Sequence, residues 1–111
     1  MAVSNDFVQY VLDQLSGLGK VHIKRMFGGA ALYQDELAFG MIANDVVYLK
    51  VDDTNRDKYL HEGSSQLKPF KNNATVLSFY NVPPDVFEDA DEFVSWAKES
   101  LEIQKKRNEF K

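Results

Sequence analysis

The sequence predicts an α+β domain in which helices pack on an antiparallel β-sheet, and three observations support this fold class. Apolar residues near both ends of the chain recur with helical spacing, and the middle of the chain holds several β-prone runs. The turns between these runs are too short for a crossover helix, so neighbouring strands must pair antiparallel. We expect a meander plus a later strand, packed with an N-terminal helix, a short middle helix and a long C-terminal helix.

The first predicted element is a helix over residues 4–18. Its apolar side chains recur every three or four positions and form one stripe: Phe7, Val8, Val11, Leu12, Leu15 and Leu18. Ser4 or Asn5 can cap the start of this helix, and Gly19 follows its end. After Gly19 the apolar pattern changes its period.

The next predicted elements are the strands of the meander. Residues 21–26 alternate apolar and polar side chains, as a half-buried strand does. Three β-prone runs follow at residues 28–34, 36–43 and 46–52, and short polar turns containing "QDE" and "ND" separate them. These segments predict three or four antiparallel strands in sequence order.

A short helix and one further strand are predicted after the meander. Residues 53–62 form the helix, which Asp53 or Thr54 can cap and which Gly63 ends. Two of its side chains are expected to face inward: Tyr59 and Leu60. Residues 64–74 have an irregular pattern, and the β-prone residues 75–82 precede two prolines, which cannot donate hydrogen bonds to a sheet.

The last predicted element is a long helix from about Asp89 to about Lys106. One of its faces carries Phe93, Trp96, Ala97, Ser100, Leu101 and Gln104. Acidic residues near its start and basic residues near its end complement the helix dipole. We assign residues 1–104 to a single domain and residues 105–111 to a basic C-terminal tail.

The predicted core draws on all the long elements. Substantial burial is expected for Phe7, Val11, Leu15, Phe27, Leu32, Phe39, Leu49, Leu77, Phe93, Trp96, Ala97 and Leu101. The chain of 111 residues is 44% hydrophobic and 27% charged, which fits one globular domain with one core. The chain is also rich in bulky aromatic residues, so its composition does not predict an intrinsically disordered protein.

Composition also limits the classes of function. The chain has no cysteine, which excludes disulfides, thiolate nucleophiles and zinc–thiolate sites and suits a reducing cytoplasm. No segment has the roughly 20 apolar residues that cross a bilayer, so no membrane association is expected. The formal net charge of −4 argues against a protein whose main work is coating nucleic acid.

Three stretches of the sequence resemble a known family. They are "MFGG" at residues 26–29, the strand pair "FGMIANDVVYLK" at residues 39–50, and "SFYNVPPDVFED" at residues 78–89. With these stretches, nearly the whole chain resembles the N-terminal domain of the TfoX/Sxy family. The resemblance implies a cytoplasmic bacterial protein related to regulators of competence for DNA uptake. Those regulators are thought to act at promoters beside the cyclic-AMP receptor protein, and catalysis is not their known activity.

The adjacent glycines Gly28 and Gly29 are predicted to be structural. A dinucleotide fingerprint needs a third glycine and a following helix, and a P-loop ends in Gly-Lys-Ser/Thr, whereas more strand follows here. We expect either a β-bulge or close packing of the first helix over the strand. No cofactor site is assigned to this segment.

The remaining residue types give no catalytic or metal site. The two histidines, His22 and His61, are not accompanied by a cluster of ligands with metal-binding spacing. No serine lies in a Gly-x-Ser-x-Gly elbow, and the carboxylates of residues 85–92 have the pattern of a helix-capping group. We therefore expect no catalytic residue, no metal and no cofactor.

Two kinds of contact surface remain as hypotheses. The main one is a non-enzymatic regulatory or protein-interaction domain that binds a protein partner, with Phe70, Tyr80 and Phe87 as contact residues. The alternative is a nucleic-acid-contacting module. In that case a basic patch would contact phosphates through Lys20, Lys24, Arg25, Lys68 and Lys71, with Phe70 stacking on an exposed base.

Overall fold

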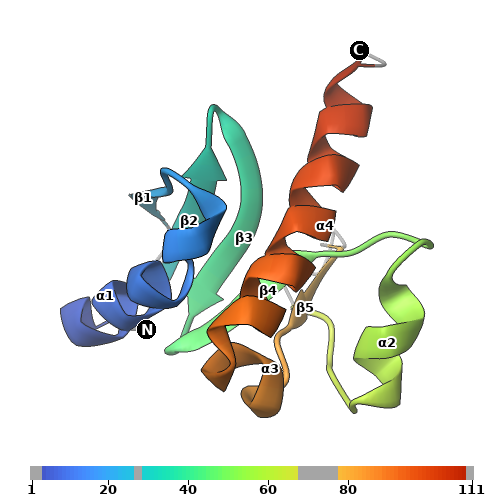
Figure 1. The fold of residues 1–111 in the computed structure, drawn as a ribbon, viewed down its shortest axis with the longest axis horizontal. Helices are drawn as coiled ribbons and strands as arrows, with labels where there is room; N and C mark the ends of the chain where they lie inside the picture. The colour runs from blue at the N-terminus through green and yellow to red at the C-terminus, as the bar shows by residue number, and fades with distance from the viewer. Residues whose placement is uncertain (1–3, 27–28, 68–77, 110–111) are drawn as a thin grey trace.

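A computed structural model describes residues 4–26, 29–67 and 78–109 of the protein. The helices and strands follow one another in the order α1 (Asn5–Gln14), η1 (Ser16–Leu18), β1 (His22–Met26), β2 (Gly29–Gln34), β3 (Leu37–Ala43), β4 (Val46–Lys50), α2 (Arg56–His61), β5 (Phe79–Asn81), α3 (Pro84–Glu88) and α4 (Ala90–Glu109). Figure 1 shows α4 running beside β3 and β4, with α1 and α2 on either side of it. The predicted α+β class is confirmed.

The sheet is a five-stranded antiparallel meander in the order β1-β2-β3-β4-β5. Turns at Asp35–Glu36 and Asn44–Asp45 join three of the strands, and all four turn residues have positive φ. Positive φ at both central positions gives a hairpin turn the twist of its flanking strands. The short turns therefore set the antiparallel pairing, as the sequence predicted.

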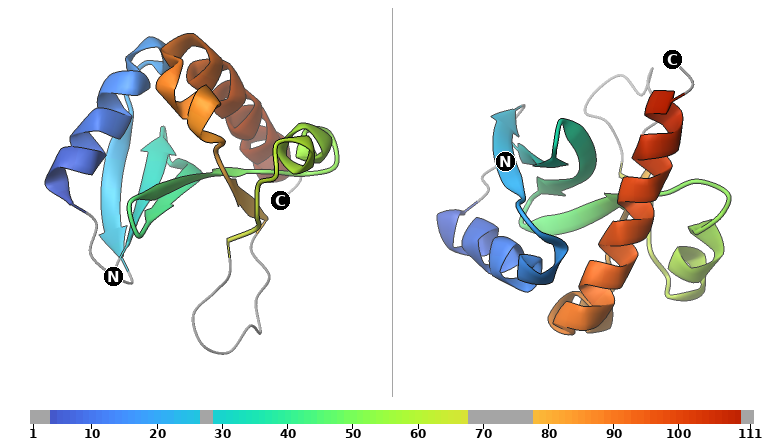
Figure 2. Two further views of the ribbon diagram at one scale, coloured as in Figure 1. Left: turned by 90° about the horizontal axis from the view of Figure 1, so that it is seen from below. Right: turned by 45° about the horizontal axis from the view of Figure 1, so that its top comes forward.

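The helices cover one face of the sheet. In Figure 2, α1 and α4 lie on the same side of the strands. The covered face presents Leu32, Ile42, Val47 and Leu49 to α4, which contributes Phe93, Ala97 and Leu101 to the same core. Burying this surface is the main stabilising contribution to the fold.

A β-bulge explains why two consecutive residues of β3 are both buried. Leu32 pairs with Gly40, but Tyr33 pairs with Ala38, so Phe39 is an extra residue in β3. Phe39 and Gly40 are both buried, although strand residues ordinarily alternate between faces. The sequence had offered a bulge at the adjacent glycines as one of two alternatives, and Gly28 lies outside the described residues.

Several predicted boundaries change in the structure. The first helix was predicted over residues 4–18, but α1 ends at Gln14 and the short 3-10 helix η1 follows it. The start of α1 agrees with the prediction, because the Ser4 hydroxyl accepts a hydrogen bond from the Phe7 amide. The predicted cap of α2 by Asp53 or Thr54 is wrong, since Asn55 occupies the N-cap position without a capping hydrogen bond. The Asn55 side chain instead accepts from the Asp52 amide at 2.8 Å.

The end of the chain differs most from the prediction. A helix, α3, begins at Pro84, whereas the prolines were expected only to end a strand; proline suits the first position of a helix because its φ is already helical. Helix α4 continues to Glu109, so the predicted tail from residue 105 begins as helix. Lys106 and Arg107 favour this extension because they complement the negative helix C-terminus.

Most of the predicted core is confirmed, with two corrections. The buried members are Val11, Leu15, Leu32, Phe39, Leu49, Phe93, Trp96, Ala97 and Leu101. Phe7 is only half-buried. Leu60, which was expected to face inward on the short middle helix, is 52% exposed, because α2 turns only Tyr59 inward. Phe27 and Leu77 lie outside the described residues.

Tyr59 is the largest fully buried side chain among the described residues. Its ring contacts that of Trp96 edge-on, with centroids 4.7 Å apart. Burial raises the pKa of this phenol well above its usual value, Glu99 raises it further, and the Ser100 hydroxyl partly opposes both. The ionised form is therefore excluded from the fold.

We expect Tyr59→Phe to weaken the loss of stability at alkaline pH. The unfolded chain loses the tyrosine proton near pH 10 while the folded chain keeps it, so wild-type stability falls as pH rises above about 10. Relative to the variant, the wild type should lose up to about 1.4 kcal/mol per pH unit in that range. Urea unfolding at pH 8 and pH 11 measures the difference, with Tyr10→Phe, whose ring is 42% exposed, as the control. An identical pH dependence in Tyr59→Phe and wild type would show that the phenol is solvated.

Candidate functional site

Three basic residues of the predicted nucleic-acid patch lie on or just before β1, the edge strand of the sheet. Lys24 and Arg25 are exposed on β1, and Lys20 is exposed in the segment just before it. The Arg25 guanidinium donates a hydrogen bond of 2.6 Å to the side chain of Asn5, which connects β1 to the first turn of α1. Lys24 and Arg25 are consecutive strand residues, so their side chains point to opposite faces of the sheet, and the structure does not gather them into one patch.

The other half of that predicted patch lies outside the described residues. Lys68, Phe70 and Lys71 all belong to residues 68–77. Their contacts with nucleic acid or protein stay predictions made from the sequence. Gly28 lies outside the described residues as well, while its neighbour Gly29 begins β2.

Gly29 lies where two backbones pass closely. A Cβ atom at this position would lie 2.5 Å from the carbonyl oxygen of Ile42 on the adjacent strand β3. The close neighbour is thus a strand and not the first helix, as one sequence hypothesis had it. Gly29 precedes a strand and not a helix, so no helix N-terminus is available there to hold a phosphate.

Tyr80 is half-buried in the sheet. It pairs with Leu49 across β4 and β5, and an isolated bridge joins it to Gln66 on its other side. Its ring lies 6.0 Å from that of Tyr59, and it packs against the core. Tyr80 therefore offers only part of its ring to a partner.

Phe87 is the centre of an aromatic cluster between α1, α3 and α4. Its ring lies 5.7 Å from that of Phe7, 5.2 Å from that of Tyr10 and 5.2 Å from that of Phe93. Phe93 is fully buried, whereas Phe7 and Phe87 are half-buried and Tyr10 is 42% exposed. We call Phe7, Tyr10 and Phe87 the aromatic surface. The Gln14 side chain donates a hydrogen bond of 2.9 Å to the Phe87 carbonyl and fixes α3 against α1.

Exposed carboxylates accompany the aromatic surface on both of its outer helices. They are Asp6 and Asp13 on α1, and Asp85 and Glu88 on α3. The first turn of α4 adds Asp91 and Glu92. The aromatic surface is therefore an apolar area in acidic surroundings.

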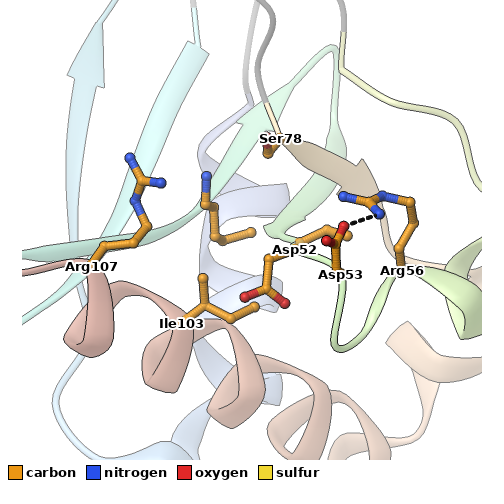
Figure 3. A pocket seen from close by; sticks show the side chains of 8 residues that line it. Asp52, Asp53, Arg56, Ser78, Ile103 and Arg107 are labelled. Atoms are coloured by element: carbon orange, nitrogen blue, oxygen red, sulfur yellow. Dashed lines mark hydrogen bonds and ion pairs between the residues drawn. The ribbon is translucent and has the colours of Figure 1, made fainter.

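A polar hollow lies on a different part of the molecule, where β4, α2 and the end of α4 meet (Figure 3). Its volume is about 250 Å³. Figure 3 shows Arg107 and Arg56 at opposite sides of the hollow in that view, with Asp52 between them. The lining residues are Lys50, Val51, Asp52, Asp53, Arg56, Ser78, Ile103 and Arg107.

Lys50 is the most buried charged residue of the hollow, with 8% of its surface exposed. Helix α4 crosses the end of β4 here, where the Ser100 hydroxyl donates a hydrogen bond of 2.8 Å to the Lys50 carbonyl. The ammonium lies 5.5 Å from the ring centroid of Phe79, its cross-strand partner. Burial lowers the pKa of Lys50, the nearby charge of Arg107 lowers it further, and Asp52 opposes the change.

The carboxylates of the hollow have local partners. Asp52 accepts hydrogen bonds from the amide and the hydroxyl of Thr54, at 2.8 Å and 2.5 Å, and Asp53 forms an ion pair of 2.6 Å with Arg56. Burial by itself would raise the pKa of Asp52, but the Thr54 hydrogen bonds and the charges of Lys106 and Arg56 outweigh it, so the pKa is lowered. Asp52 is therefore ionised at neutral pH.

The described residues contain no group of three or more His, Cys, Asp or Glu side chains able to hold a metal ion. His22 stacks on Tyr33 with ring centroids 5.7 Å apart, and His61 is exposed at the end of α2. Among the helices that the structure describes, none combines the length and the apolar character needed to span a bilayer.

Comparison with known proteins identifies the family. The family model described as "TfoX N-terminal domain" matches residues 13–103, which is most of the chain. This chain belongs to the TfoX N-terminal domain family. A similar protein from Spirochaeta aurantia is named "Uncharacterized 12.7 kDa protein in trpE 5′ region". It is 30% identical over 93 residues, which cover 84% of this chain and 76% of that protein.

The motifs of this TfoX N-terminal domain contain several of the candidate contact residues, among them Lys50, Tyr80 and Phe87. The motif "FGMIANDVVYLK" forms the β3–β4 hairpin, and "SFYNVPPDVFED" runs from the start of β5 through α3. Phe7 and Tyr10 precede the matched segment, and Arg107 follows it. The two surfaces therefore combine family-matched elements with residues from the flanks.

Sequence reasoning missed the hollow of this TfoX N-terminal domain entirely. Lys50 is the last residue of the alternating strand β4 and was not singled out, and Arg107 was assigned to a tail. The one available signal was the run "YLKVDD", which places a lysine and two aspartates at the end of a β-prone segment. It does not reveal that α4 folds back over that position.

Proposed function

We propose that this TfoX N-terminal domain is a non-enzymatic, cytoplasmic regulatory domain that binds a protein partner through the aromatic surface. The observation that carries the proposal is the Tyr10 ring, which is 42% exposed while its edge contact with Phe87 holds it in place at 5.2 Å. Aromatic side chains are enriched at protein interfaces because they bury a large area with few rotatable bonds. The aromatic surface is thus suited to act as an anchor.

The charges around the aromatic surface favour a particular kind of partner. Asp6, Asp13, Asp85 and Glu88 are exposed on the two outer helices and give them a negative potential. A partner segment with aliphatic or aromatic anchors and Lys or Arg at its rim would complement this surface. The same carboxylates would repel the phosphates of nucleic acid at this face.

Membership of the TfoX N-terminal domain family supports a regulatory role. The resemblance seen in the sequence implies competence regulators, which are not known to be catalysts. A purified protein that turned over a common substrate class would contradict the non-enzymatic part of this proposal.

Site-specific photo-crosslinking in cells tests the proposed partner contact. A photoreactive amino acid replaces Tyr10 in one variant and Leu60 in another, because both side chains are exposed and Leu60 lies on α2. We expect one discrete protein adduct from position 10 and none from position 60. Reversing the charges with Asp85→Lys and Glu88→Lys should reduce the position-10 adduct severalfold, because the basic rim of the partner would then be repelled.

The outcome against this proposal is equally specific. An adduct that is absent at position 10, equal at both positions or unchanged by charge reversal would overturn it. Nucleic-acid contact is the second candidate, favoured by the exposed Lys20, Lys24 and Arg25 beside and along β1. An NMR titration with a mixed-sequence DNA duplex would support that candidate if shifts gather on these residues and fade as salt rises.

A further inference from the structure

The polar hollow holds a buried cation that lacks an ion-pair partner. Lys50 lines the hollow with 8% of its surface exposed, and no carboxylate of the described residues forms an ion pair with it. Residues 68–77, which precede the lining residue Ser78, contain no Asp or Glu. A buried ammonium without a contacting counter-charge is costly, so its retention beside an open hollow points to an external anion.

A second cation lines the same hollow. Arg107 comes from the last part of α4, and its charge adds to the effect of burial in lowering the pKa of the Lys50 ammonium. Arg107 also forms no ion pair with any carboxylate in the part of the chain that the structure describes. Two like charges facing one hollow repel each other, and a bound anion would turn this repulsion into attraction.

Neither acidic residue of the hollow forms an ion pair with Lys50 or Arg107 among the described residues, although Asp52 attracts Lys50 from a distance. Asp52 is held by Thr54, and Asp53 is held by Arg56 at 2.6 Å. The volume of about 250 Å³ suits a group the size of a phosphate ester and not a drug-sized ligand.

We propose that the hollow binds a small molecule bearing a phosphate group, with Lys50 and Arg107 as the residues that hold the phosphate. A guanidinium can donate two parallel hydrogen bonds to phosphate oxygens, and a lysine ammonium adds a compact positive charge. Ser78 lines the same hollow, and its hydroxyl is a further donor of the required type. The site uses none of the residues of the aromatic surface, so its test is independent of the proposed protein contact.

The test is an NMR titration of labelled full-length protein with inorganic phosphate and, separately, with phenyl phosphate. We expect saturable shifts of the amide signals of Lys50, Asp52, Ser78 and Arg107 with both probes. Lys50→Met keeps the apolar stem, and Arg107→Gln keeps an amide donor; each should weaken binding by at least about tenfold. Lys105→Gln is the matched control, because Lys105 is on the same helix but pairs with Glu102 outside the hollow.

Three results would overturn this inference. One is the absence of saturable shifts with either probe, and another is binding that is equal in wild type, Lys50→Met and Arg107→Gln. The third is a short DNA duplex that shifts the hollow signals at lower concentration than phenyl phosphate, which would assign the site to nucleic acid. Arg107→Gln keeps the test decisive should Lys50→Met fail to fold, because Arg107 is an exposed helix residue.

Discussion

Phe93→Ala should destabilise the domain by about 3–5 kcal/mol. Phe93 lies in the first part of α4, has no exposed surface and contacts the Phe87 ring edge-on with centroids 5.2 Å apart. Its removal would leave a cavity where α3, α4 and the sheet meet, and neither helix can collapse into it without losing other contacts. Because small domains are stable by only about 5–15 kcal/mol, this is a large share of the total.

Urea unfolding followed by Trp96 fluorescence and by circular dichroism measures that loss. The matched control is Phe7→Ala, which removes the same side chain from a half-buried position on α1. The Phe7 variant should lose clearly less stability than the Phe93 variant. Equal losses at the two positions would show that the helical faces of α1 and α4 have been misassigned.

Gly29→Ala is expected to have the next largest effect. The added Cβ atom would lie 2.5 Å from the carbonyl oxygen of Ile42. The Cβ atom is bonded directly to the backbone of β2, and the oxygen belongs to the backbone of the paired strand β3. Neither group can rotate away, so β2 and β3 must separate at this point. We expect a loss of about 1–3 kcal/mol or more, as for other substitutions that force extra atoms into a packed core.

The control for this prediction is Gly17→Ala. A Cβ atom at Gly17 would have as its nearest neighbour a side-chain methyl of Val94 at 3.6 Å, which is ordinary van der Waals contact. This variant should be neutral or slightly stabilised, since alanine reduces the freedom of the unfolded chain. Similar denaturation midpoints for Gly29→Ala and wild type would mean that the two strands are less tightly paired than the structure shows.

The fold could be predicted from the sequence wherever a local rule decides the outcome. Short turns such as Asn44–Asp45 leave antiparallel pairing as the only choice, and alternation within β4 places Val47 and Leu49 in the core. The helical stripe of α4 likewise identified Phe93 and Leu101 as buried. These features are determined by residues close together in the sequence, so the sequence pattern is sufficient to predict them.

The predictions of burial and secondary structure that were wrong concern residues whose environment depends on tertiary contacts. Leu60 and Tyr59 are equally apolar by pattern, but only Tyr59 faces Trp96, since α2 presents a single narrow face to the core. The segment after α2 seemed irregular, yet the Leu67 amide donates to the Phe79 carbonyl at 2.7 Å and adds a partner to β5. Periodicity does not record such long-range hydrogen bonds.

The candidate sites were predictable to different degrees. Phe87 was named from the sequence, and the structure adds Phe7 and Tyr10, whose place beside it depends on how α1 packs against α3. The hollow could not be predicted, because Lys50 and Arg107 meet only after α4 crosses the end of β4. A lysine at the end of a strand ordinarily remains solvated.

The two ends of the sheet are protected against aggregation in different ways. Beside β5, residues 65–67 of the same chain hydrogen-bond to its backbone and occupy that edge. No described strand pairs with the outer edge of β1, where Lys24 and Arg25 are exposed. Placing positive charges on an unpaired edge discourages identical molecules from joining their sheets. Replacing these two side chains with threonine or valine would therefore remove this protection and favour edge-to-edge assembly.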